Sequence, residues 1–245
     1  MTERQRVTAE GPTLSPKVLI TGTGRAGTTL LVQVLTDLGL ETGFGPDSVI
    51  DERAQAGLEL PAGDPASPRI VKSPNLTRRM GELISEGRLN VEHVIIPIRD
   101  LDVATASRVR LTRYGSDLHT WGGLIGTTRA TKQRTVLAER QYELMYTIAK
   151  YNLPHTLLLF PKFASDWQYT FDRLSFLDPE IPSESWRECL MNRVRPDLIH
   201  ESPLSSKERL LTVGGTAYNR GVLRPLRALR NLTVRTHRDP TERKD

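Results

Sequence analysis

The sequence is poor in cysteine and in long apolar runs, and both shortages narrow the classes of protein to which it can belong. One cysteine, Cys189, excludes an internal disulfide bond and a zinc site built from cysteines. No apolar run is long enough to cross a bilayer, and residues 1–16 lack the apolar core of a secretory signal. We therefore expect a cytoplasmic protein with no transmembrane segment and with a disordered lead over residues 1–16.

Aromatic residues are also scarce, and this shortage bears on the basic C-terminus. Residues 220–245 hold eight Lys and Arg against three Asp and Glu, a difference that equals the net charge of the whole chain, +5. Such a tail can bind nucleic acid or acidic lipid, but no aromatic residue follows Tyr218, so a solvated surface is the simpler interpretation. We expect no nucleic-acid partner, one α/β domain over 17–220 and a basic tail over 221–245.

Strand-like and helix-like stretches alternate along the domain. Apolar runs predict strands at residues 17–21, 69–74, 91–99 and 155–160. Apolar residues at helical spacing predict helices at residues 28–38, 77–86, 101–109, 132–150 and 167–177. This alternation is typical of an α/β fold with a parallel, doubly wound sheet, in which ligands bind beyond the carboxyl ends of the strands. Segments 43–68 and 110–132 would form small caps.

A glycine-rich turn joins the first predicted strand to the first predicted helix, within KVLITGTGRAGTTLLVQVL (17–35). It matches the dinucleotide fingerprint G-x-G-x-x-G at Gly22, Gly24 and Gly27. That interpretation requires a second strand that ends in an acid about 20 residues on. Glu41 and Asp47 stand at roughly that distance, but the intervening segment is too short and too rich in glycine to form the strand. The dinucleotide interpretation is therefore the weaker one.

The same turn also fits the loop of nucleotide triphosphatases, G-x-x-x-x-G-K-[ST]. Thr29 occupies the hydroxyl position, but Thr28 stands where the motif has lysine, and the nearest cation is Arg25. The loop therefore predicts an anion cradle of backbone N–H groups at a helix N-terminus, with an arginine beside it. The alternatives are a small-molecule kinase with a degenerate loop, a nucleotide-binding module without catalysis, and an ordinary tight turn.

A second pair of anion-binding candidates follows the third predicted strand, within HVIIPIRDLDVATASRV (93–109). Arg99 closes the strand, and Ser107 lies eight residues later, just over two helical turns away. A guanidinium at a strand end and a hydroxyl on the next helix can converge on one phosphate. A surface ion pair of Arg99 with Asp100 or Asp102 is the alternative.

Together these elements resemble the sulfotransferases that use 3′-phosphoadenosine 5′-phosphosulfate (PAPS). In that family a loop [KR]-[ST]-G-T-T binds the 5′-phosphosulfate, and an Arg and a Ser eight residues apart bind the 3′-phosphate. Residues 25–29 (RAGTT) match the loop except at Ala26, and Arg99 and Ser107 match the second element in type and spacing. Lys72, in VKSPNL, resembles the K-x-P lysine of the tyrosylprotein and related sulfotransferases.

The resemblance implies a P-loop NTPase-like fold, PAPS as the cofactor and no metal ion, because a donor without a γ-phosphate needs no magnesium clamp. The implied cofactor-binding residues are Thr23, Gly24, Arg25, Ala26, Gly27, Thr28, Thr29, Arg99 and Ser107. In the implied reaction an acceptor oxygen attacks in line while charge builds on the leaving phosphate oxygen. Cations aimed at that oxygen lower the barrier, and Arg25 and Lys72 are the catalytic candidates.

A general base must accept the proton of the acceptor hydroxyl. The tyrosylprotein relatives use a glutamate a little over twenty residues beyond the loop arginine, and Asp47, 22 residues after Arg25, is the nearest equivalent. The competing candidates are Asp51, Glu52, Glu59 and His119. The acceptor is expected to be a small molecule, sugar or lipid with a hydroxyl, and the few aromatic residues in the caps do not favour a flat phenol.

Overall fold

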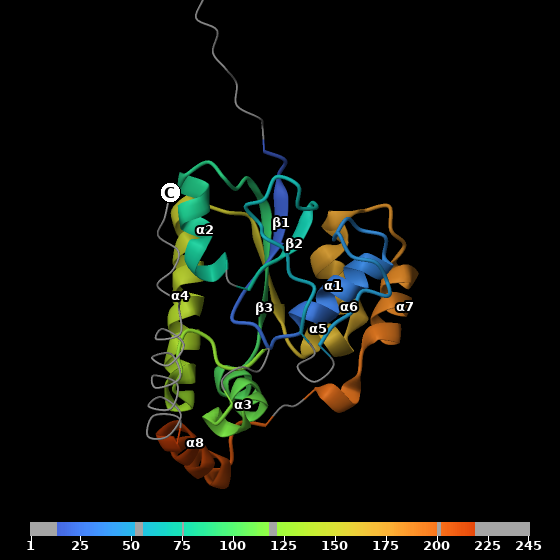
Figure 1. Cartoon of the computed structure of the whole chain (residues 1–245). Helices are drawn as coiled ribbons and strands as arrows, with labels where there is room; N and C mark the ends of the chain where they lie inside the picture. The colour runs from blue at the N-terminus through green and yellow to red at the C-terminus, as the bar shows by residue number, and fades with distance from the viewer. Residues whose placement is uncertain (1–13, 52–55, 75, 118–121, 200–201, 219–245) are drawn as a thin grey trace, which may run out of the picture.

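Four short strands form one parallel sheet at the centre of the protein (Figure 1). The computed structural model describes residues 14–51, 56–74, 76–117, 122–199 and 202–218. The strands lie in the order β2-β1-β3-β4 and comprise β1 (Lys17–Ile20), β2 (Ile70–Lys72), β3 (Val91–Ile98) and β4 (His155–Leu159). The predicted α/β class and parallel sheet are confirmed. The tail over 221–245, and residues 1–13 of the lead, lie outside the described residues.

Strand β1 has a parallel neighbour on each side, and this arrangement creates a crevice. It pairs with β2 through Val18↔Ile70 and with β3 through Leu19↔Val94. The chain therefore moves to one side of β1 for β2 and to the other side for β3. In such sheets the loops that follow the two diverging strands meet beyond their carboxyl ends. These ends face the lower edge of the sheet in Figure 1, where α3 (Leu101–Leu111) lies.

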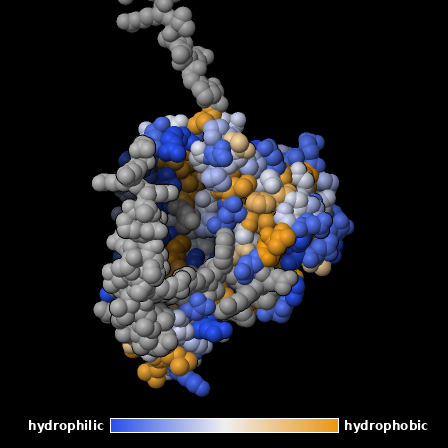
Figure 2. All heavy atoms as spheres, viewed as in Figure 1, coloured by the Kyte–Doolittle hydropathy of each residue, from blue (hydrophilic) through white to orange (hydrophobic). Residues whose placement is uncertain are grey.

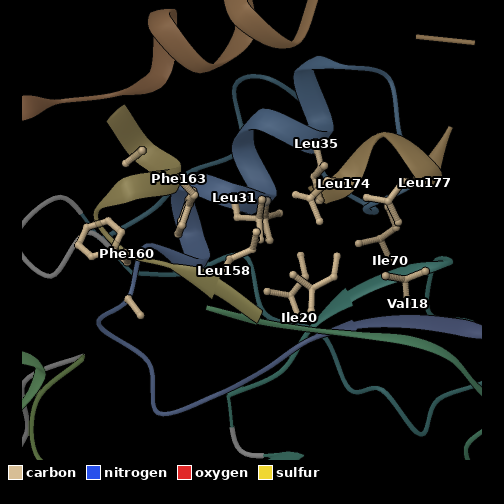
Figure 3. Packing of buried hydrophobic residues seen from close by; sticks show 14 of the residues in the cluster. Val18, Ile20, Leu31, Leu35, Ile70, Leu158, Phe160, Phe163, Leu174 and Leu177 are labelled. Carbon is tan, nitrogen blue, oxygen red and sulfur yellow. The ribbon is translucent and has the colours of Figure 1, made fainter. Parts of the chain in front are cut away.

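Helices cover both faces of the sheet and bury two apolar clusters (Figure 1). One face is covered by α1 (Thr28–Asp37), α5 (Lys162–Ser165), α6 (Trp167–Leu174) and α7 (Ser183–Arg193). The other is covered by α2 (Leu76–Ser85) and α4 (Gln133–Tyr151). Strand side chains alternate between the faces, so that Val18 and Ile20 meet Leu31 and Leu35 of α1 (Figure 3), whereas Leu19 packs in the second cluster. The doubly wound arrangement predicted from the sequence is observed.

The structure contains helices that apolar spacing did not predict. They are α5, α7, α8 (Ser206–Tyr218) and the single 3₁₀ turns Arg113–Gly115, Ala130–Lys132 and Pro196–Leu198. The 3₁₀ turn Ser175–Leu177 falls within the helix predicted over 167–177. Helix α8 was missed because it buries Thr212 and Thr216 and exposes apolar Leu210, Leu211 and Val213. Figure 2 shows an orange group at its lower end, where Figure 1 places α8. None of the helices in the described parts of the chain is long and apolar enough to span a membrane.

Candidate functional site

The loop between β1 and α1 (residues 21–27) has a strained backbone. Gly24, Arg25 and Gly27 have left-handed φ values of 69°, 59° and 75°. Glycine adopts this conformation freely, but a left-handed arginine costs about 1–3 kcal/mol. Long-range contacts hold Arg25 in place: Arg99 Nη1 donates to its carbonyl oxygen at 2.8 Å, and Arg25 Nε donates to Ser107 Oγ at 3.0 Å. The tertiary structure therefore fixes the turn.

The N-terminus of α1 carries no side-chain cap. Gly27 occupies the N-cap position without a capping hydrogen bond, and the first turn contains no acidic residue. The first N–H groups and the helix dipole therefore favour an anion at this position. Glycine is required here also by packing, because a Cβ on Gly27 would lie 2.7 Å from ring atoms of Phe160 and Phe163, which pack beside α1 (Figure 3).

A cavity of about 290 Å³ opens beside this loop and the first turns of α1. Six of its lining side chains are cationic: Arg25, Lys72, Arg99, Arg108, Arg193 and Arg195. Glu59 contributes the single carboxylate among the described residues of the lining. Such an excess of positive charge in a concave site attracts anions.

Lys72 enters the cavity from the carboxyl end of β2 and is 2% exposed. Its Nζ donates to Thr29 Oγ1 at 2.9 Å and to the carbonyl oxygen of Gly57, and lies 3.5 Å from Glu59 Oε1. Burial lowers the pKa of Lys72 to about 8, although the neighbouring charge of Glu59 raises it. Lys72, the lysine of the predicted motif, therefore contacts the hydroxyl of Thr29 in the first turn of α1.

Arg99 and Ser107 come to the same loop, as neighbours of Arg25. The Arg99 guanidinium also lies over the ring of Phe160, 4.9 Å from its centroid. Burial and the charge of Arg99 lower the pKa of Arg25 to about 10. The two sequence motifs thus form one cationic cluster beside the start of α1.

The acidic residues that were the alternative partners of Arg99 have other contacts. Asp100 caps α3 by accepting from the backbone N–H of Val103 at 2.9 Å. Asp102 forms an ion pair with Arg134 at 2.6 Å. Each carboxylate therefore has a partner, and neither residue belongs to the cavity lining.

Arg108 is a cavity residue that the sequence reasoning missed. It follows Ser107 on α3, is 4% exposed, and donates from Nη2 to the carbonyl oxygen of Thr23 at 2.6 Å. Burial, together with the charges of Arg25 and Arg140, lowers the pKa of Arg108 to about 9. One feature of the sequence agrees with this contact: position 24 is a glycine, and a Cβ there would lie 2.5 Å from Arg108 Nη2.

The cavity is also lined by Phe160, Arg193 and Arg195, which were not predicted, and by the segment 122–125, which belongs to the predicted cap over 110–132. Arg193 is held at the end of α7 by Asp37, through two hydrogen bonds of 2.5 and 2.7 Å. No local motif marks these residues, since they reach the loop only through the packing of distant elements.

Asp47, the first-choice general base, does not lie in the cavity lining. It is exposed, and its segment is attached to α7 because Arg193 Nη2 donates to the carbonyl oxygen of Pro46 at 3.0 Å. Asp51 is exposed and forms an isolated backbone bridge with Ala56. Glu59 does line the cavity, with 34% of its side chain exposed.

The two remaining base candidates, Glu52 and His119, lie outside the described residues. The described residues contain no group of three or more His, Cys, Asp or Glu side chains that could hold a metal ion. The site is therefore characterised by its cations, by one carboxylate at its rim and by an uncapped helix start, which together can bind a ligand with several negative charges. Comparisons of the chain with protein-family models, with curated proteins and with solved structures find no match.

Proposed function

We propose that this chain is a sulfotransferase that moves the sulfuryl group of PAPS to a hydroxyl acceptor. The observation that carries the proposal is the convergence of four cations on the start of α1. Arg25 comes from the loop, Lys72 from β2, Arg99 from the end of β3 and Arg108 from α3. PAPS carries a phosphosulfate at the 5′ position and a phosphate at the 3′ position, so a site with several separate cations suits it.

The contact between Lys72 and Thr29 favours this donor over a nucleoside triphosphate. In triphosphatases the hydroxyl at the position of Thr29 binds magnesium. Here that hydroxyl accepts a hydrogen bond from Lys72 Nζ at 2.9 Å. An ammonium group then supplies positive charge where a kinase uses a metal ion, which supports transfer from a donor that needs no magnesium clamp.

The proposed reaction is an in-line displacement at sulfur. The acceptor oxygen forms a bond to sulfur, the bond between sulfur and the phosphate oxygen breaks, and 3′,5′-bisphosphoadenosine leaves with the electron pair. Arg25 and Lys72 would stabilise the charge that develops on the leaving oxygen. With pKa values of about 10 and 8, both are mainly protonated at pH 7.

The acceptor proton needs a base close to the reacting atoms. Glu59 replaces Asp47 as our candidate, because Glu59 lines the cavity beside Lys72 and Asp47 does not line it. The products are then bisphosphoadenosine, a sulfate ester and one proton carried by the base.

The test is a calorimetric titration of the full chain with 3′,5′-bisphosphoadenosine and with ATP–magnesium, each repeated in saturating EDTA. We expect the bisphosphate to bind more tightly, and EDTA to leave both its affinity and the transfer of labelled sulfate from PAPS unchanged. A strict magnesium requirement together with tighter binding of ATP would favour the kinase. Tight binding without any transfer, to water or to a panel of hydroxyl acceptors, would favour the non-catalytic nucleotide-binding module.

A further inference from the structure

Arg108 joins two walls of the cavity that are far apart in the sequence. Its Nη2 donates to the carbonyl oxygen of Thr23 in the phosphate-binding loop, at 2.6 Å. Its Nη1 donates to the carbonyl oxygens of Gly122 and Gly123, at 3.2 and 2.6 Å. A single buried guanidinium therefore connects the loop to the segment 122–125, and both of these line the cavity.

The surroundings are shaped to keep this guanidinium in position. Gly24 leaves the space that Nη2 occupies, since a Cβ there would approach it to 2.5 Å. The other end of the segment is held by the fully buried amide of Gln133, which accepts from the N–H of Ile125 at 2.8 Å and donates to its carbonyl oxygen at 3.3 Å. The segment 122–125 is thus attached to the domain through two buried side chains, of which only Arg108 also contacts the phosphate-binding loop.

The positive charge of Arg108 is poorly compensated in the protein itself. Its hydrogen-bond partners are neutral carbonyl oxygens, and its Nε has no hydrogen-bond partner among the described residues. The charges of Arg25 and Arg140 lower the pKa of Arg108 by more than the charge of Glu59 raises it. A buried cation in such surroundings is stabilised strongly by a nearby anion, because the local dielectric constant is low. An anion bound at the start of α1 would supply that stabilisation.

We propose that Arg108 is a positioning residue that couples the occupied phosphate-binding loop to the cavity wall formed by residues 122–125. When an anion occupies the loop, the Arg108 guanidinium is held more firmly, and so are the carbonyl oxygens of Gly122 and Gly123 that it binds. The bound donor thereby organises one wall of the cavity. The identity of the anion rests on the proposed function, whereas the attachment by Arg108 does not depend on it.

The test is amide hydrogen exchange of the full chain, measured with and without 3′,5′-bisphosphoadenosine. Wild type is compared with Arg108→Lys, which keeps the charge but loses the planar fork, and with Arg110→Lys as the matched control. Arg110 lies on the same helix and binds Glu208 and the carbonyl oxygens of Ser202 and Pro203, away from the cavity lining.

In the absence of ligand, we expect peptides that contain residues 122–125 to exchange about tenfold faster in Arg108→Lys than in wild type, because two charge-assisted hydrogen bonds to the segment are lost. Arg110→Lys should leave these peptides unchanged and accelerate exchange in α8 instead. With the bisphosphate bound, wild type should show protection of both residues 21–27 and residues 122–125, and Arg108→Lys protection of residues 21–27 alone.

Equal exchange of the 122–125 peptides in wild type and Arg108→Lys without ligand would overturn the attachment. Equal ligand-induced protection of these peptides in both proteins would overturn the coupling. A bisphosphate that fails to bind wild type would instead count against the proposed function, and the ligand-free comparison would still decide the attachment. If Arg108→Lys does not fold, Arg108→Met takes its place, because it keeps an apolar stem without the buried charge. The hydrogen exchange of the same peptides is then compared between Arg108→Met and wild type.

Discussion

Two arginines on α3, two residues apart, illustrate two different uses of a cation in this protein. Arg110 donates to Glu208 at 2.8 Å, and this contact, with those of Ser205, lowers the pKa of Glu208 to about 2. Arg108 binds three carbonyl oxygens, and its own pKa falls to about 9. The charge of Arg110 is therefore paired with a carboxylate, whereas the hydrogen-bond partners of Arg108 are neutral carbonyl oxygens.

A similar contrast separates Arg69, which lies outside the cavity lining, from three of the cavity cations. Outside the cavity lining, Arg69 pairs with Glu92, and this hydrogen bond raises the pKa of Arg69. In the cavity, burial lowers the pKa values of Arg25, Lys72 and Arg108. Ion pairs of the first kind stabilise the fold modestly, whereas buried cations destabilise the ligand-free protein and are typical of functional sites. Loss of a surface ion pair should therefore lower stability and leave activity unchanged. Loss of a buried cavity cation should lower activity without lowering stability.

The largest expected effect is on turnover in Lys72→Met. Loss of a cation aimed at the leaving oxygen should lower the rate of sulfuryl transfer from PAPS by about 10²–10³, roughly 3–4 kcal/mol, and should change donor affinity much less. The free energy of unfolding at pH 7 should not fall, because the variant removes a buried charge. Transfer is followed with labelled PAPS, affinity by calorimetry and stability by urea unfolding. A change confined to donor affinity would make Lys72 a binding residue only.

A smaller effect is expected on nucleotide affinity in Arg99→Ala. If Arg99 binds the 3′-phosphate, the affinity for 3′,5′-bisphosphoadenosine should fall about 10–100-fold, the equivalent of a charge-assisted contact worth about 1.5–3 kcal/mol, while 5′-AMP should lose much less. Arg110→Ala is the control, and should lower the melting temperature without changing either affinity. Equal losses for both nucleotides in Arg99→Ala would contradict the assignment of Arg99 to the 3′-phosphate.

The smallest expected effect is the pH dependence that Lys72 confers. Its pKa is about 8 in the folded protein against 10.5 for an ordinary lysine, so it loses its proton as the pH rises through 8. Affinity for 3′,5′-bisphosphoadenosine should then fall by up to about tenfold between pH 7 and pH 9. Lys72→Met should lack this step, and an unchanged profile in the variant would assign the step to another group.

The same pKa gives the sign of the effect on stability. The unfolded chain binds the Lys72 proton more tightly than the folded protein does. Lys72 should therefore increase the free energy of unfolding as the pH rises from about 8 to 10.5. Chemical unfolding of wild type and Lys72→Met across this range measures the contribution as the difference between the two curves. Identical curves would show that burial does not shift the pKa of Lys72.

The sequence by itself determined the sheet and the glycine-rich turn between β1 and α1, because the signals for both are local. Strand and helix periods repeat within a few residues, and the glycines that permit left-handed φ values, Gly24 and Gly27, stand only three positions apart in the loop. Arg99 was found because it ends a strand, at the edge of the sheet where ligands bind, and Ser107 because it lies on the helix that follows. Lys72 was found through its resemblance to the K-x-P lysine. Helix α8 was not predicted, because it buries threonines and exposes its apolar residues.

Only the tertiary structure decided which charged groups share the cavity. Arg108 is indistinguishable in sequence from Arg110, and the packing of α3 against the segment 122–125 and against α8 gives them different partners. The described segments 43–51 and 56–59 likewise place Asp47 near Arg193 and Glu59 beside Lys72. Loops have no periodic pattern that fixes their path, so long-range contacts determine which of their side chains reach the site.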